Sequence, residues 1–174
     1  GALRWIGNIT SSNEVMVAWH TAPVKTFADA KKTQLIIGAA AASSVGTKFG
    51  AVANNLLGTK FKIIYGYPGA SDLNLAMERG ETQGRSSGIW ATVKATSPHW
   101  ITEKKLNVLV QIGLRRDPDL PDVPLLIELA ENAEQRAILE FITKCAIVGR
   151  PFAVGSAVPK ERVEILRRAF DRAV

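Results

Sequence analysis

The segment Gly38-Ala-Ala-Ala-Ala-Ser-Ser-Val-Gly46 has the composition of a loop that binds an anion. It follows an apolar run and precedes a helical pattern, so a ligand can approach its backbone closely. The first-turn N–H groups and the dipole of the following helix favour negative charge at that place. We expect a carboxylate or a phosphate at Ala42, Ser43, Ser44 and Val45, with a serine hydroxyl as an added donor. The alternative is a tight connection between strand and helix that binds nothing.

Two further segments offer similar groups. Gly66-Tyr-Pro-Gly-Ala-Ser-Asp72 follows the next apolar run, and it makes Tyr67, Gly69 and Ser71 candidate binding residues. Gly84-Arg-Ser-Ser-Gly88 supplies a guanidinium and the hydroxyls of Ser86 and Ser87 among small residues. In α/β proteins the carboxyl ends of neighbouring parallel strands meet at one edge of the sheet, where ligands bind. We therefore expect these loops to converge on one site.

Groups for catalysis or metal binding are scarce. His20 and His99 are the two histidines, and neither belongs to an HExxH motif or lies near a serine elbow. The glycine-rich loop lacks the lysine of GxxxxGKS and the spacing of GxGxxG. The single cysteine, Cys145, lies in an apolar helical pattern that predicts a buried structural thiol. We expect no catalytic residue, no metal ligand and no cofactor.

The elements that must hold these loops alternate between two patterns. Continuous apolar runs, typical of strands covered on both faces, are followed by amphipathic helical segments, which predicts an α/β fold. Strands are expected at Glu14–Trp19, Gln34–Gly38, Phe61–Tyr65 and Asn107–Ile112, and helices at Thr47–Leu57 and Ser71–Arg79.

The ends of the chain carry further elements. Arg4–Ile9 is expected to be a strand, and the proline-rich segment Arg115–Pro124 an irregular loop. Helices are expected at Leu125–Ala130, at Ala133–Ile147 with capping spacing between Asn132 and Gln135, and from Pro159 onward; a short strand is expected at Phe152–Val154.

Bulk composition is that of a folded globular protein. The 174 residues are 47% hydrophobic and 22% charged, with a formal net charge of +6. The basic residues are scattered pairs such as Lys31-Lys32 and Arg167-Arg168, with no aromatic residues between them, which argues against nucleic acid as a partner. The most apolar short stretch, Leu35–Ala42, is far shorter than the roughly 20 residues that span a bilayer, so direct membrane insertion is not expected.

The motif Asp119-Leu-Pro-Asp-Val-Pro124 is followed by Glu128. It resembles the LPDVPT..E loop of one family, the substrate-binding receptors of tripartite tricarboxylate transporters, also called Bug-type receptors. The stretch from Arg150-Pro-Phe-Ala-Val154 through Val158-Pro-Lys-Glu-Arg-Val163 also resembles the family, as does Gly69 with Asn74-Leu-Ala-Met-Glu-Arg-Gly80. The resemblance extends over nearly the whole chain.

The resemblance implies an α/β, type II periplasmic-binding-protein-like architecture with two lobes joined by crossing strands. Residues 21–106 would form the second ligand-binding lobe, nearly complete. Residues 1–20 and 111–174 would form part of the first lobe, which is then incomplete in this chain. The strands at 14–19 and 107–112 would be the two that cross between the lobes.

The resemblance also implies a function. The protein would be a periplasmic receptor that captures a small carboxylate and delivers it to the membrane subunits of the transporter, without catalysis. The family's AGxGS loop falls on Ala41–Ser44 and its YKG loop on Tyr67–Gly69. The family's GxVD turn falls on Gly80–Gln83, which lacks the aspartate.

Two other classes of protein are alternatives. The effector-binding domain of a LysR-type transcription regulator shares the two-lobed plan, but it would follow a helix-turn-helix segment, and the proline-rich loop does not resemble that family. A phosphate-handling transferase would need the lysine and the catalytic histidines that the motifs lack.

Overall fold

The computed structural model describes residues 2–8, 12–147 and 151–174, and its centre is a mixed sheet of five strands in the order β4-β3-β5-β2-β6. β3 pairs in parallel with β4 and β5, whereas β2 runs antiparallel to β5 and β6. The carboxyl ends of four strands and the amino end of β2 therefore share one edge of the sheet. The strands are β2 (Glu14–Trp19), β3 (Leu35–Ala39), β4 (Phe61–Tyr65), β5 (Gly84–Arg85) and β6 (Leu106–Ile112).

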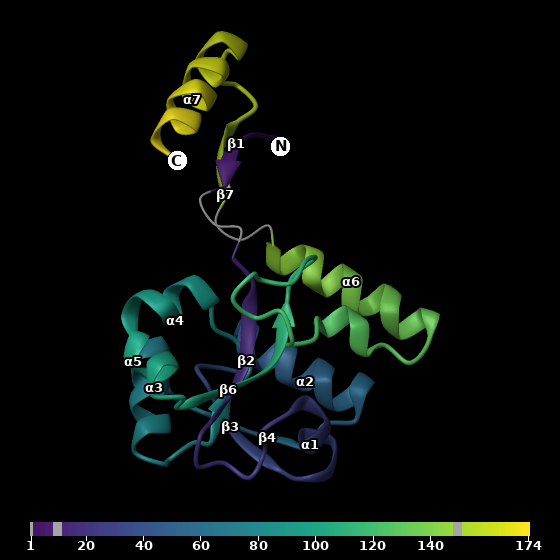
Figure 1. The fold of residues 1–174 in the computed structure, drawn as a ribbon. Helices are drawn as coiled ribbons and strands as arrows, with labels where there is room; N and C mark the ends of the chain where they lie inside the picture. Colours follow the sequence, from purple (N-terminus) through teal and green to yellow (C-terminus); the bar gives the residue numbers. More distant parts are fainter. Residues whose placement is uncertain (1, 9–11, 148–150) are drawn as a thin grey trace.

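Helices cover both faces of this sheet (Figure 1). One face carries α1 (Phe27–Lys32), α2 (Val45–Leu57) and α6 (Ala133–Ile147); the other carries α3 (Ala70–Glu78), α4 (Trp90–Thr96) and α5 (Pro98–Thr102). Two hydrophobic cores result, and β2 contributes to both. Its Met16 and Ala18 belong to the first core, and Val15, Val17 and Trp19 belong to the second. Burial on both faces confirms the prediction drawn from its continuous apolar run.

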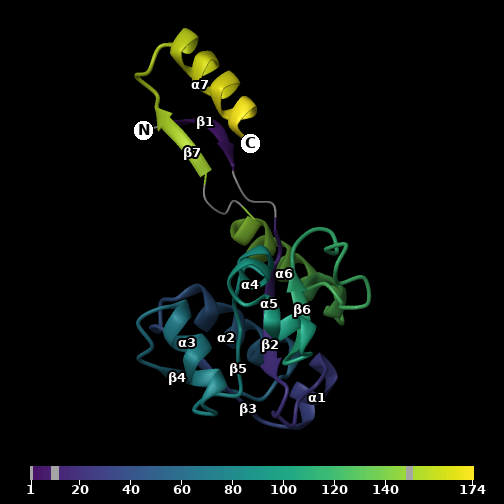
Figure 2. The ribbon, with the colours of Figure 1, turned by 60° about the vertical axis from the view of Figure 1, so that its left-hand side comes forward.

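A second, smaller assembly contains both ends of the chain. β1 (Leu3–Asn8) pairs antiparallel with β7 (Pro151–Gly155), and α7 (Lys160–Ala173) packs against β1. Gly7 is required at this contact, because a Cβ there would lie 2.2 Å from the ring of Phe170. Figures 1 and 2 show this assembly standing apart from the five-stranded sheet.

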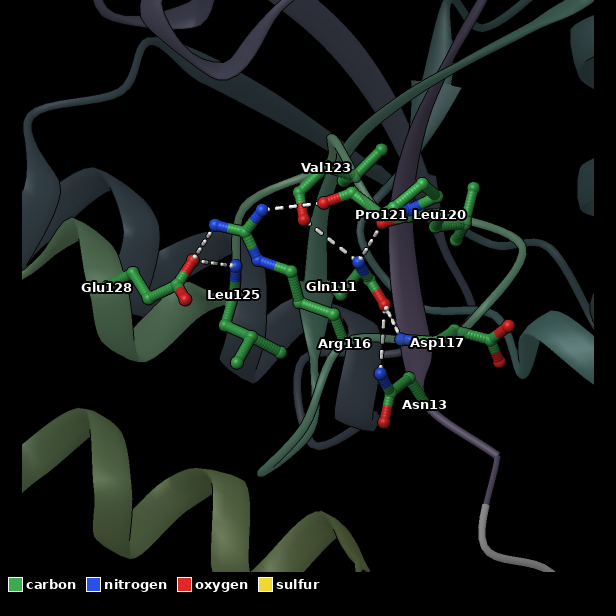
Figure 3. A network of polar contacts seen from close by, with 9 residues as sticks. All are labelled: Asn13, Gln111, Arg116, Asp117, Leu120, Pro121, Val123, Leu125 and Glu128. Carbon is green, nitrogen blue, oxygen red and sulfur yellow. Dashed lines mark hydrogen bonds and ion pairs between the residues drawn. The ribbon is translucent and has the colours of Figure 1, made fainter.

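The proline-rich loop is held by one buried amide, that of Gln111 in β6 (Figure 3). Gln111 Oε1 accepts hydrogen bonds from Asn13 Nδ2 at 2.9 Å and from the Asp117 amide at 2.8 Å. Gln111 Nε2 donates to the carbonyl oxygens of Leu120 at 2.8 Å and Val123 at 2.9 Å. One side chain thus joins the loop to β6 and to the start of β2.

An exposed ion pair holds the outer side of the same loop. Arg116 donates to the carbonyl oxygen of Pro121 at 2.6 Å and to the carboxylate of Glu128 at 2.7 Å. Glu128 also accepts from the Leu125 amide at 2.9 Å. The hydrogen bond from Arg116, followed by that amide, lowers the pKa of Glu128.

Most predicted elements are confirmed, with corrections at particular places. The segment expected as a helix at Leu125–Ala130 is a single 3₁₀ turn, η1 (Leu126–Leu129), while α6 begins and ends where predicted. Asn132 caps α6, because its Oδ1 accepts from the Gln135 amide at 2.9 Å. Cys145 is exposed on α6, so the prediction of a buried thiol was wrong. Ile9 and Arg150, parts of two predicted motifs, lie outside the described residues.

Within the described ranges, no helix combines the length and apolarity needed to cross a membrane.

Candidate ligand-binding site

A cavity of about 300 Å³ opens at the sheet edge where β3 and β5 end. The end of β3 supplies Ala39 and Ala40, and β5 supplies Arg85. The parallel pairing of β3 with β5, through Ile37 and Gly84, brings these two strand ends together. The cavity therefore lies where ligands bind in α/β sheets.

First turns of two helices line the same cavity. Ser44, Val45 and Gly46 belong to the start of α2, and Gly69 and Ala70 to the start of α3. The leading N–H groups of a helix have no partner inside the helix, and the helix dipole makes that end positive. Both helix starts therefore suit a ligand with negative charge.

Arg85 supplies the cavity with a full positive charge. It is only 5% exposed, and its Nη1 donates to Asn74 Oδ1 at 2.7 Å. Its buried Nε has no hydrogen-bond partner among the described residues. Burial lowers the pKa of Arg85, and the nearby charge of Glu14 opposes this. A buried guanidinium with an unused N–H is suited to a carboxylate, whose two oxygens match its planar donors.

Glu14 lies beside this cavity at the start of β2. Burial raises the pKa of its carboxyl group, against the effects of a hydrogen bond from the Ser87 hydroxyl and of the charge of Arg85. Glu14 is opposite Ile112 in the β2–β6 pairing and also bridges to Ile89. Glu14 does not line the cavity itself, but its carboxylate is hydrogen-bonded to Ser87, which does.

The sequence predicted nine binding residues, and the structure brings four of them to this cavity: Ser44, Val45, Gly69 and Ser87. The other five do not line it. Ala42, Ser43 and Ser71 are exposed, Tyr67 is half-buried, and Ser86 is buried with its hydroxyl bonded to the carbonyl oxygen of Gly46.

Two residues of the site, Glu14 and Asn74, were missed by the sequence prediction. The guanidinium of Arg85 was noted in the segment Gly84-Arg-Ser-Ser-Gly88, but Arg85 was not named as a binding residue and its burial was not predicted. Glu14 and Asn74 had no comparable signal, because a polar residue at a strand end or on a helix is usually solvated.

A larger cavity, of about 610 Å³, lies at the opposite end of β2 beside Trp19. Both histidines of the sequence, His20 and His99, line it together with Glu78. His99 Nε2 lies 4.0 Å from Glu78 Oε1, which also accepts from Trp100 Nε1 at 2.8 Å. Among the described residues, no group of three or more His, Cys, Asp or Glu side chains could hold a metal ion.

No protein-family model matches the sequence, and no curated protein matches it. Solved structures do match. A TctC solute binding protein from Polaromonas, solved without ligand, has a TM-score of 0.63 and 20% identity over 98% of this chain and 55% of that chain. A protein of R. palustris solved with adipate has a TM-score of 0.57 and 15% identity over 98% of this chain and 67% of that chain. The periplasmic binding protein BugD has a TM-score of 0.56 and 15% identity over 95% and 58%.

The fold is therefore that of the periplasmic binding proteins, a mixed α/β architecture. Within that class its structural neighbours are the TctC and BugD receptors of the tripartite tricarboxylate type, which confirms the resemblance seen in the sequence. The chain spans 55 to 67% of the length of these neighbours, consistent with one incomplete lobe.

Proposed function

We propose that this chain is the larger part of a periplasmic solute-binding receptor that captures a small carboxylate for a tripartite tricarboxylate-type transporter. The receptor binds its ligand without catalysis and passes it to the membrane subunits. The solute-binding neighbours support a binding role, and the adipate in one of them is a carboxylate.

The observation that carries the choice of a carboxylate is the buried guanidinium of Arg85. Its Nε lacks a partner, and an unsatisfied buried polar group costs roughly 1–3 kcal/mol, more for a charged one. A carboxylate would remove that cost and place its charge between the starts of α2 and α3. The apolar wall formed by Val45, Leu73 and Ile89 would cover the remainder of a small organic acid.

We assign residues 21–106 to the second lobe and residues 1–20 and 111–174 to part of the first. In this arrangement β2 and β6 cross between the lobes, and the cavity at Arg85 is the second lobe's half of the ligand cleft. The ligand would then be enclosed when the lobes close.

Calorimetry on the full-length protein with mono-, di- and tricarboxylates tests this proposal. We expect at least one small carboxylate to bind, and we expect Arg85→Gln to weaken it roughly 10- to 100-fold, because hydrogen bonds to charged groups contribute about 1.5–3 kcal/mol. Arg79→Gln, an exposed arginine of the same lobe, is the matched control and should bind normally. Equal affinity in the Arg85 and Arg79 variants would place the carboxylate elsewhere.

A further inference from the structure

The serine hydroxyl groups at the candidate site donate their protons to acceptors within the protein. A serine hydroxyl has one proton to donate and two lone pairs that accept. Ser87 donates its proton to the Glu14 carboxylate, which in its ionised form can only accept. Ser86 donates to the carbonyl oxygen of Gly46. Neither hydroxyl can therefore donate to a ligand as well.

The hydroxyl proton of Ser44 is also used within the protein, in its contact with Thr47. Thr47 Oγ1 donates to the carbonyl oxygen of Ala41 at 2.7 Å, so its single proton is used there. In the 3.0 Å contact between Ser44 Oγ and Thr47 Oγ1, the donor must then be Ser44. The sequence suggested this hydroxyl as a donor to the ligand, but the structure directs its proton into the cap of α2.

The two sides of the cavity consequently have opposite hydrogen-bonding character. Arg85 and the leading amides of α2 and α3 can only donate. Ser87 lines the cavity, and its Oγ has lone pairs but no free proton. A carboxylate oxygen facing Ser87 would meet another acceptor, with the charge of Glu14 behind it. A hydroxyl or ammonium group at that place would donate to Ser87 and meet favourable charge.

We propose that Ser87, oriented by Glu14, is a specificity-determining acceptor that selects carboxylates bearing a hydroxyl or ammonium donor close to the carboxylate. The inference rests on the proposed function, since it assumes that Arg85 holds the carboxylate. The ligand's carboxylate pairs with Arg85, and its neighbouring donor bonds to Ser87.

The ionised state of Glu14 determines that Ser87 donates in the hydrogen bond between them and can only accept from a ligand. Burial raises its pKa, whereas Ser87 and Arg85 lower it. The described residues paired with Glu14 across the sheet are uncharged, namely Ile112 of β6 and Ile89 before α4. When the pH falls through the pKa of Glu14, the carboxyl group gains its own proton and no longer requires that of Ser87. The preference is therefore present above this pKa and lost below it.

Calorimetry at pH 7.5 with four small acids tests the inference in the full-length protein: butyrate, 2-hydroxybutyrate, 3-hydroxybutyrate and succinate. We expect one of the two hydroxy acids to bind about 2- to 10-fold more tightly than butyrate, because it adds one hydrogen bond, and succinate to gain nothing over butyrate. Ser87→Ala should bring the affinity ratio of that hydroxy acid to butyrate close to one. Ser71→Ala, an exposed serine outside the cavity, should keep the ratio.

A second variant, Glu14→Val, removes the acceptor of the Ser87 proton and suits a strand. We expect the affinity of succinate to rise relative to that of the hydroxy acid that the wild-type protein prefers, with folding checked by the melting curve. If butyrate binds the wild-type protein as tightly as both hydroxy acids, or Ser87→Ala keeps the preference, the inference is wrong while carboxylate capture stands. If none of the four acids and no other carboxylate binds, the proposed function fails and the inference fails with it.

Discussion

At the scale of single residues, the buried polar side chains have the most clearly defined roles. Arg85 and Gln111 are both almost fully enclosed, but their partners differ. The Gln111 amide makes four hydrogen bonds within the protein, whereas Arg85 keeps one buried N–H without a partner. The first arrangement stabilises a loop, and the second is suited to a ligand.

Gln111→Leu should therefore destabilise the protein by about 3 kcal/mol. The change removes one hydrogen bond each from Asn13, the Asp117 amide and the carbonyl oxygens of Leu120 and Val123, although Asn13 and Leu120 each keep another partner. A buried group left unpaired costs roughly 1–3 kcal/mol before relaxation. Urea unfolding measures the loss. Gln34→Leu, at an exposed glutamine, is the matched control and should change the free energy of unfolding by less than about 0.5 kcal/mol. Similar values for both variants would refute the role of Gln111.

The site was only partly predictable from residue types. Sequence patterns located Ser44, Val45, Gly69 and Ser87 because loops that join parallel strands to helices meet at one sheet edge. They could not tell which hydroxyl protons were free, since that depends on partners such as Thr47 and Glu14. That Arg85 is suited to bind a carboxylate likewise becomes clear only once its burial is known.

At the scale of elements, helix α2 both stabilises the fold and lines the candidate site with its first turn. Ser44 is its N-cap and accepts from the Thr47 amide at 3.4 Å, and Gly58 ends the helix in the left-handed conformation at φ 71°. The sequence predicted this helix at Thr47–Leu57. It did not predict α1, α4 or α5, because five to seven residues carry too little periodic pattern to be recognised.

Ser44→Ala should remove the side-chain cap of α2 and cost about 1 kcal/mol of stability, or about 2–4 °C in Tm for a chain of this size. Ser43→Ala, at the exposed neighbour, should leave the melting temperature unchanged. Differential scanning calorimetry of the pair decides the matter. Equal melting temperatures for the two variants would show that the cap contributes nothing.

At the scale of the whole molecule, the β1–β7–α7 assembly has little to pack against. Several of its apolar side chains are exposed, including Leu3 at 73%, Ile165 at 56% and Phe152 at 46%. A two-stranded sheet is at best marginally stable alone, and contiguous apolar surface promotes association. The structural neighbours are longer than this chain. Under the proposed lobe assignment, we expect other parts of the first lobe to cover these residues in a full-length receptor.

The 174-residue chain alone should therefore form dimers or larger species at micromolar concentration. Light scattering coupled to gel filtration measures its mass, and Ile165→Glu should shift the chain toward the monomer. Glu161→Gln, on an exposed position of the same helix, serves as the control and should leave the distribution unchanged. A strictly monomeric chain would contradict the assignment of this surface to a missing partner.

Carboxylate capture at Arg85 can be observed directly through the Nε–H group of that arginine. Its NMR signal in ¹⁵N-labelled full-length protein is assigned by its loss in Arg85→Gln and followed while a binding carboxylate is added. Because this N–H has no partner among the described residues, a carboxylate that bonds to it should shift the proton resonance downfield and slow its exchange with water. An Arg85 signal that stays unchanged while calorimetry reports a bound carboxylate would show that the ligand lies elsewhere.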